Sequence, residues 1–467
     1  FNCSRDYKTN THIYNDDSEM PRKRGMSTPK SQSNPGHQAK GKTRDSGPFF
    51  STSLTLTIGV LAIGVLVPLS YGLFGDTKSK TAVIDLKGLP ETAQIIDQRS
   101  FNVLERVPPP TEANATTRFL WPGVTHESLL ERPFHVYDAE FLDIIGSNPT
   151  LTLLATSDRD PIFHEAVVWH PPTEEVFFVQ SAGSPDAGTG LEKSSIIQKI
   201  SLAEAEALRN GSHTQSQVEI AVVDSEPQVI NPNGGTNYKG QIIFAGEGQG
   251  EDVPSALYLM NPEKPYNTTI LVNNYFGRQF NSLNDVSVNP INGHIYFTDT
   301  MYGYWQHFRP EPGLRNQVYR LDPDTGALAV VADGFAAPNG ITFSPDGRYA
   351  YITDTGLSNG LFGVNPTNPA SIYRFDIQKD GSWDNRKTFA YVGSRLPDGI
   401  HCDSKGNVYA GCGDGVHVWN PSGKLIGKIY TGMNAANFQL VGNGRMIIMG
   451  RTRLFYATIA ASEAPLS

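Results

Sequence analysis

A weak internal repeat constrains the fold of this chain more than any other feature. In each copy a polar residue opens a short apolar strand, a turn follows, and a second apolar strand comes next. The six copies begin at Glu165, Asn233, Asn284, Asn339, Asp398 and Asn437. The spacings between these starts are 68, 51, 55, 59 and 39 residues, which leaves room for about four strands in each copy. The pattern predicts an all-β, six-bladed β-propeller over residues 135–467.

The two ends of this region are expected to pair in one blade. After Gly450 the sixth copy supplies only one further strand-like run, LFYATI. The run LTLLATS at residues 151–157 comes before the first copy and is predicted to complete the sixth blade. This pairing joins both ends of the propeller and removes an exposed sheet edge. A β-sandwich is the alternative fold, but six units exceed what one sandwich requires.

The chain before the repeats has a different composition. Residues 1–48 are polar and basic without apolar periodicity, which predicts a disordered cytoplasmic tail. Residues 49–74 carry no charge and are long enough for a single transmembrane helix, which needs about 20 apolar residues. A cleaved signal peptide, and hence a secreted protein, is the alternative. Residues 75–134 are predicted to be a linker or N-terminal extension.

Charge indicates the side of the membrane and the class of partner. The basic flank before residue 49 predicts a single-pass protein whose C-terminal domain lies outside the cytoplasm. Glycosylation sequons at Asn114, Asn210 and Asn267 agree with that side. Without residues 1–48 the totals of 38 Lys/Arg and 47 Asp/Glu fall by nine and five, to 29 and 42. This acidic remainder argues against a nucleic-acid partner.

The opening residues of the six copies form a candidate cation site. The innermost strands of a propeller start at one face of the central channel, so these residues are expected to form a ring. Glu165 and Asp398 supply carboxylates and the other four positions supply amides, with no Lys or Arg. Oxygen donors of this kind suit a hard divalent cation, calcium above all, with Mn²⁺, Mg²⁺ or Zn²⁺ as alternatives. The turn preference of Asn and Asp explains any single position, but not six in phase.

Two further segments are expected at the same face. Residues 301–315 include Tyr302 among several aromatic residues and are predicted to wall a pocket above the cation. Residues 274–280 include Arg278, which is expected to bind substrate oxygens. The string at residues 356–360 matches a nucleophile elbow but lacks the helix that such a turn requires, so no serine nucleophile is predicted.

Four segments of the chain resemble the SMP-30/gluconolactonase family, and most closely the fungal lactonohydrolases that open aldonate lactones and D-pantoyl lactone. They are FHEAVVW, NSLNDVSVNP, PNGITFSPDG and LPDGIHCDSKGNVYAGCGDG. The resemblance covers about residue 88 to the end, and it implies a six-bladed propeller with a catalytic divalent cation, usually calcium. It implies Glu165, Asn339 and Asp398 as ligands, with Asp398 also as the base. Asn284 is implied to lie on the substrate side of the cation, near enough to be a further ligand.

The sequence therefore predicts a metal-dependent lactone hydrolase, which is a carboxylic-ester hydrolase. The cation would polarise the lactone carbonyl and activate a water, while Asp398 or Glu165 takes the proton. Asn284 and Asn233 would hold carbonyl or hydroxyl oxygens of the substrate. Animal members of the family have an Arg where this chain has Ser282, so Arg278 or the aromatic loop is expected to replace it.

Two other functions stay open at this point. A propeller enzyme of paraoxonase or strictosidine-synthase type would use the same channel for different chemistry, because a fold does not fix a function. A non-catalytic, calcium-stabilised binding module would use the ring only as a structural site. Activity of a metal-free preparation would favour the synthase, and calcium-dependent melting without turnover would favour the module.

Overall fold

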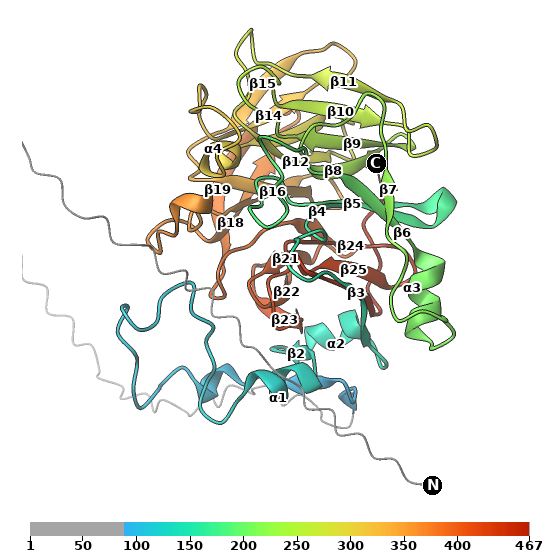
Figure 1. Cartoon of the computed structure of the whole chain (residues 1–467). Helices are drawn as coiled ribbons and strands as arrows, with labels where there is room; N and C mark the ends of the chain where they lie inside the picture. The colour runs from blue at the N-terminus through green and yellow to red at the C-terminus, as the bar shows by residue number, and fades with distance from the viewer. Residues whose placement is uncertain (1–87, 467) are drawn as a thin grey trace, which may run out of the picture. The chain divides into compact units, whose positions relative to one another are not determined.

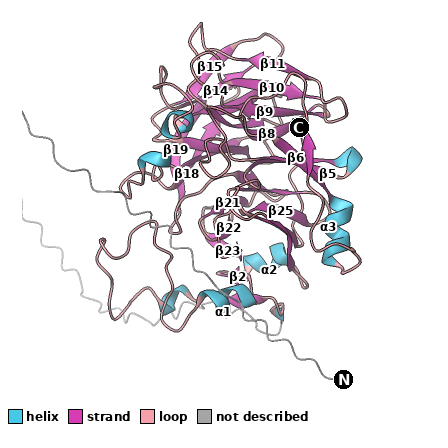
Figure 2. Cartoon of the chain, in the orientation of Figure 1, coloured by secondary structure: helices cyan, strands magenta, loops and turns pink. Residues whose placement is uncertain are grey.

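The computed structural model describes residues 88–466, which fold into six β-sheets arranged as the blades of a propeller (Figures 1 and 2). Blade one contains β4 (Glu165–His170), β5 (Glu175–Val179), β6 (Ile197–Ser201) and β7 (Ala221–Val223). Blade two contains β8 (Pro232–Tyr238), β9 (Gln241–Gly246), β10 (Ala256–Met260) and β11 (Thr268–Val272). Blade three contains β12 (Leu283–Val288), β13 (Ile295–Asp299), β14 (Gln317–Leu321) and β15 (Leu328–Ala332). Blade four contains β16 (Pro338–Phe343), β17 (Tyr349–Asp354), β18 (Ser371–Ile377) and β19 (Trp383–Tyr391).

Blade six contains strands from both ends of the propeller. It consists of β24 (Asn437–Leu440), β25 (Arg445–Met449), β26 (Arg453–Thr458) and β3 (Thr150–Thr156). The strands β26 and β3 are antiparallel, with Thr458 opposite Thr150 and Arg453 opposite Thr156. The sequence-based predictions of a six-bladed propeller and of its closure by this strand are therefore confirmed. The closure holds the ends of the sheet ring together by hydrogen bonds along a full strand.

Blade five is larger than the others because the N-terminal extension adds strands to it. Its own strands are β20 (Ile400–Cys402), β21 (Val408–Cys412), β22 (Gly415–Trp419) and β23 (Leu425–Tyr430). Two outer strands follow, β2 (Phe134–Val136), antiparallel to β23, and β1 (Ala93–Ile95), parallel to β2. Part of the segment expected to be a linker or extension thus forms the outer edge of a blade.

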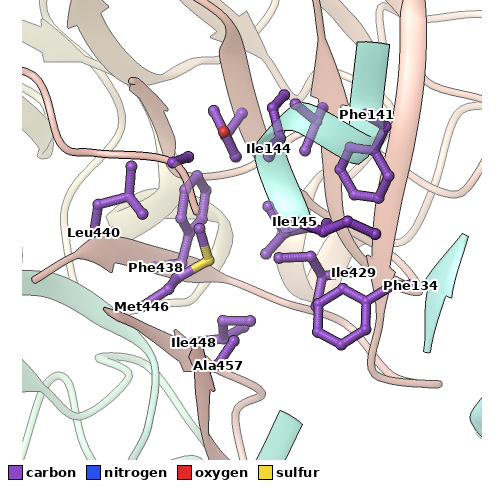
Figure 3. Packing of buried hydrophobic residues seen from close by; sticks show 14 of the residues in the cluster. Phe134, Phe141, Ile144, Ile145, Ile429, Phe438, Leu440, Met446, Ile448 and Ala457 are labelled. Carbon is purple, nitrogen blue, oxygen red and sulfur yellow. The ribbon is translucent and has the colours of Figure 1, made fainter. Parts of the chain in front are cut away.

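The described residues also form four short α-helices. They are α1 (His126–Glu131), α2 (Glu140–Ile145), α3 (Leu202–Arg209) and α4 (Tyr302–Trp305). The helix α2 buries Phe141, Ile144 and Ile145 against blades five and six, where Ile429 and Phe438 belong to the same apolar cluster (Figure 3). Gly427 on β23 lets the ring of Phe141 approach, because a Cβ at that position would lie 2.2 Å from the ring. This packing attaches the extension to the propeller.

The predicted tail, residues 1–48, and the predicted transmembrane helix, residues 49–74, lie outside the described residues. Within residues 88–466 no helix has the length and apolar composition that crossing a membrane requires. The three sequon asparagines, Asn114, Asn210 and Asn267, are all exposed. The extracytoplasmic placement of the domain stays a sequence-based prediction.

Candidate functional site

The six ring residues lie at the starts of the inner strands or just before them. Glu165 and Asn437 are the first residues of β4 and β24, and Asp398 comes two residues before β20. In β4, β8, β12 and β16 the register with the second strand shifts at this point. A β-bulge of this kind changes the direction of a side chain and ends regular pairing. The polar side chains at the strand starts therefore lie at the channel and do not follow the alternation of faces that a regular strand shows.

Hydrogen bonds between blades hold the carboxylate side of the ring together. The amide Nδ2 of Asn437 donates to Oε2 of Glu165 over 2.6 Å. The side chain of Asn339 donates to the carboxyl of Asp398, which also shares a hydrogen bond with Glu165. The structure thus brings Glu165, Asp398, Asn339 and Asn437 into one connected group, although they come from four blades.

The amide side of the ring is linked through the backbone. Nδ2 of Asn233 donates to the main-chain oxygen of Asn284 over 2.9 Å. The main-chain oxygens of Asn339 and Asp398 accept hydrogen bonds from Thr298 and Thr353, at 2.7 and 2.8 Å. These bonds satisfy the backbone at the bulges and fix the positions of the side chains.

The two carboxyl groups have perturbed acidities. Burial and the nearby charge of Asp398 raise the pKa of Glu165 well above its ordinary value. Burial raises the pKa of Asp398 to about 7, although the charge of Arg451 and the hydrogen bond from Asn339 act in the opposite direction. Two adjacent buried carboxylates repel each other when both are ionised. A cation between them would remove this cost.

The donor set fits a hard divalent cation. Oδ1 of Asn284 is buried and has no hydrogen-bond partner among the described residues, so it is an oxygen donor available to a ligand. No group of three or more His, Cys, Asp or Glu side chains placed to bind a metal occurs in residues 88–466. A ligand set at the ring must therefore combine the two carboxylates with the amides Asn339 and Asn284. Oxygen-only sets of this composition are typical of calcium.

The two other predicted site residues have different surroundings. The hydroxyl of Tyr302 lies 2.6 Å from Oγ1 of Thr355. Burial, together with the charges of Asp398, Asp354 and Glu165, raises the pKa of Tyr302. Arg278 is exposed on the turn before β12, and its guanidinium lies over the ring of Tyr275 at 5.9 Å. Arg278 thus makes no contact with the six residues of the channel ring.

Sequence reasoning missed three titratable groups at the site. Burial lowers the pKa of His164, next to Glu165, to about 3, and that of His401 to about 4, so both imidazoles are neutral at pH 7. Burial raises the pKa of Glu247 to about 7, and its Oε1 accepts a hydrogen bond of 2.7 Å from Ser282. Glu247 directly follows β9, the second strand of its blade, at the same face as the ring. This position, directly after the second strand of a repeat, is the sequence signal that could have identified Glu247.

A buried arginine fixes the aromatic loop. The guanidinium of Arg309 donates to the main-chain oxygens of Asn281, Phe280, Gly250 and Val253. It also donates to the side chain of Gln279. Arg309 is only 6% exposed, so these acceptors replace water at a charged group. The loop that holds Tyr302 is therefore anchored to blades two and three.

The family model described as the SMP-30/Gluconolactonase/LRE-like region matches residues 164–448, which include all six ring positions. The chain belongs to this family. Lactonohydrolase oryH of Aspergillus oryzae is 26% identical to it over 370 residues, covering 64% of this chain and 74% of that protein. The gluconolactonase of Zymomonas mobilis is 32% identical over 177 residues, covering 34% and 45%.

Solved structures agree on the fold of this SMP-30/gluconolactonase-family protein. A gluconolactonase from Xanthomonas campestris superposes with a TM-score of 0.53 at 24% identity, over 70% of this chain and 94% of that chain. A second structure, described as that of a putative gluconolactonase, gives a TM-score of 0.57 at 22% identity. At these identities the likeness supports the propeller architecture.

Proposed function

We propose that this protein is a metal-dependent lactone hydrolase that opens aldonate or pantoyl-type lactones to hydroxy acids. The observation that carries the proposal is the buried pair of Glu165 and Asp398 beside Asn339. The family and the relatives named lactonohydrolase and gluconolactonase support the same reaction class. Each relative is a different protein, so the substrate of this chain is inferred from its site.

Four side chains would hold the cation, namely Glu165, Asn339 and Asp398, with Asn284 as a further donor. A bound divalent cation, for which calcium is the best match, supplies Lewis-acid polarisation of the lactone carbonyl. Asn437 holds Glu165 in position through its 2.6 Å hydrogen bond. The amide of Asn339 does the same for Asp398. Both carboxylates thus keep one orientation without the help of solvent.

Asp398 is the proposed general base. It takes a proton from the attacking water as the water oxygen bonds to the carbonyl carbon. When the ring C–O bond breaks, the leaving oxygen takes a proton back from Asp398, so the products are one hydroxy acid and the unchanged enzyme. With a cation bound, Asp398 is ionised at neutral pH, because a nearby positive charge favours the charged form of a carboxyl group, and the ionised carboxylate can accept the proton of the water. Glu165 is the alternative base.

Substrate oxygens would be positioned by amides and by one phenol. The free Oδ1 of Asn284 can accept a hydrogen bond from a substrate hydroxyl if it does not bind the cation. Asn233 stands next to it and uses Nδ2 for the backbone of Asn284, which leaves its own Oδ1 as an acceptor. Such acceptors suit lactones with several hydroxyl groups.

The experiment that tests the function follows acid release by the full chain from D-pantoyl lactone and from glucono-1,5-lactone, with calcium present. We expect turnover of at least one lactone and no turnover of an open-chain ethyl ester of similar size. Turnover of aryl esters in preference to lactones would instead indicate a paraoxonase-type enzyme. Absence of all turnover, with calcium still raising the melting temperature, would assign the ring to a binding module.

Tyr302→Phe is expected to raise KM about tenfold or less and to change kcat little. The substitution removes the hydroxyl bonded to Thr355 near the carboxyl pair but keeps the ring packed. A lost hydrogen bond costs about 0.5–1.5 kcal/mol, which sets the size of the effect. Tyr304→Phe on the same helix is the control, because the Tyr304 ring contacts Phe362 and its hydroxyl makes no hydrogen bond within residues 88–466. Equal kinetics of both variants would remove Tyr302 from the substrate-binding set.

A further inference from the structure

A cavity lies outside the central channel, between the N-terminal extension and blade five. Its volume is about 250 Å³. Residues 98–137 form one side, and residues 391–430 of blades four and five form the other. Figure 1 shows the extension with α1 near β2, which pairs with β23. None of the six ring residues lines it, so it is separate from the proposed active site.

Aromatic rings form a large part of the cavity wall. They include those of Phe101, Trp121, Tyr137, Tyr391, Trp419 and Tyr430. Phe101 and Trp121 hold each other at a centroid distance of 5.1 Å, and His135 stacks on Tyr430 at 4.8 Å. Pockets for drug-sized ligands measure about 300–1,000 Å³, so this cavity suits a molecule with one ring. Flat walls of this kind favour a planar, aromatic occupant through offset or edge contacts.

The charges at the base of the cavity balance one another. Asp414 lies 2.6 Å from Nε2 of His417 and 3.2 Å from Nζ of Lys428. Burial acts to raise the pKa of Asp414, but Lys428 and His417 hold it far below its ordinary value. Burial and the charge of Lys428 lower the pKa of His417. The base therefore carries one negative and one positive charge, with a neutral imidazole.

Arg118 leaves the cavity with a net positive charge. It is exposed, and one Nη1–H donates to the main-chain oxygen of Gly432 over 2.7 Å. No carboxylate of the described residues lies within ion-pair distance of it. Arg118 and Tyr430 both line the cavity, so the guanidinium belongs to its wall. A guanidinium has five N–H donors, and the free ones match the two oxygens of a carboxylate.

We propose that this cavity binds a small aromatic carboxylate, with its ring between the aromatic walls and its carboxylate on Arg118. The charges of Asp414 and Lys428 in the cavity cancel each other, which disfavours a second charge on the ligand. The positive charge of Arg118 disfavours a cationic ligand. The site does not depend on the lactonase proposal. Ser394 in its wall stands four residues before Asp398, so the ligand would bind close to the loop that holds the proposed base.

The test is isothermal titration of the full chain with benzoate. Benzamide, which is neutral, and cyclohexanecarboxylate, which is not aromatic, are the comparison ligands. We expect saturable binding of benzoate and binding of both comparison ligands weaker by about tenfold or more, which corresponds to about 1.4 kcal/mol. Absence of saturable binding, or equal affinity for benzoate and benzamide, would overturn the proposal.

Two variants locate the binding site. Arg118→Gln is expected to weaken benzoate at least about tenfold while leaving the affinity for benzamide unchanged. Gly393→Phe is expected to abolish binding by filling the cavity, because a Cβ at Gly393 meets no atom within 4 Å. Arg159→Gln, at an exposed arginine before β4, is the matched control and should bind as the unaltered protein does. Benzoate binding that survives both cavity variants would place it elsewhere and overturn the assignment.

Discussion

Asp398→Asn is expected to lower kcat for lactone opening by about 10³-fold or more. The substitution removes the proposed base, and general base catalysis by one positioned group contributes about 10²–10⁴-fold. It also removes a charged donor from the cation site while keeping the shape of the side chain. The rate of acid release under saturating lactone, with calcium present, measures the effect.

The fold of this variant is expected to survive. Burial and the proximity of the Asp398 charge to Glu165 are costs in the metal-free protein, so the neutral amide removes a repulsion. The melting temperature in chelator should therefore be no lower than that of the unaltered chain. Asp384→Asn, the same change at an exposed position of β19, is the control and should leave the rate unchanged. A near-normal rate in Asp398→Asn would refute the assignment of the base.

The channel ring could be predicted from the sequence because a polar residue stands at the same position in every copy of the repeat. A polar residue opens each inner strand, and six strands in phase define a circle without any knowledge of packing. The aspartates at the ends of the second strands have a structural role instead. Asp299 at the end of β13 accepts hydrogen bonds from the backbone of Asn281 and Ser282. Asp354 does so for Ala336 and Ala337 one blade later.

Other features depend on contacts between distant segments and left no local pattern. The strands β1 and β2 have three residues each, too few for a strand periodicity, and β2 forms because Phe134 pairs with Ile429 across the sheet. The cavity beneath the extension exists only once those strands have joined blade five. For Arg278 the sequence position was misleading. It stands shortly before a ring residue, but the sequence does not determine the direction in which an exposed turn points.

Removal of divalent cations is expected to abolish lactone turnover, and addition of calcium is expected to restore it. The physical reason is the paired burial of Glu165 and Asp398, whose repulsion a cation converts into attraction. A ligand that binds only the native state stabilises it by about 2.7 kcal/mol at one hundred times its dissociation constant. The melting temperature of the chelator-treated chain should therefore rise with calcium concentration.

The substitution Glu165→Gln distinguishes calcium binding at the ring from effects of calcium elsewhere on the protein. The amide keeps the size of the side chain but removes one of the two ligand charges, so both the calcium-dependent rise in melting temperature and the recovery of turnover should require higher calcium. Glu263→Gln, at an exposed loop position, is the control and should respond as the unaltered chain does. If turnover persists in chelator, or if Glu165→Gln has the calcium response of the control, the ring is not a catalytic cation site. The asparagines would then serve as hydrogen-bonding groups around two carboxyls that share a proton.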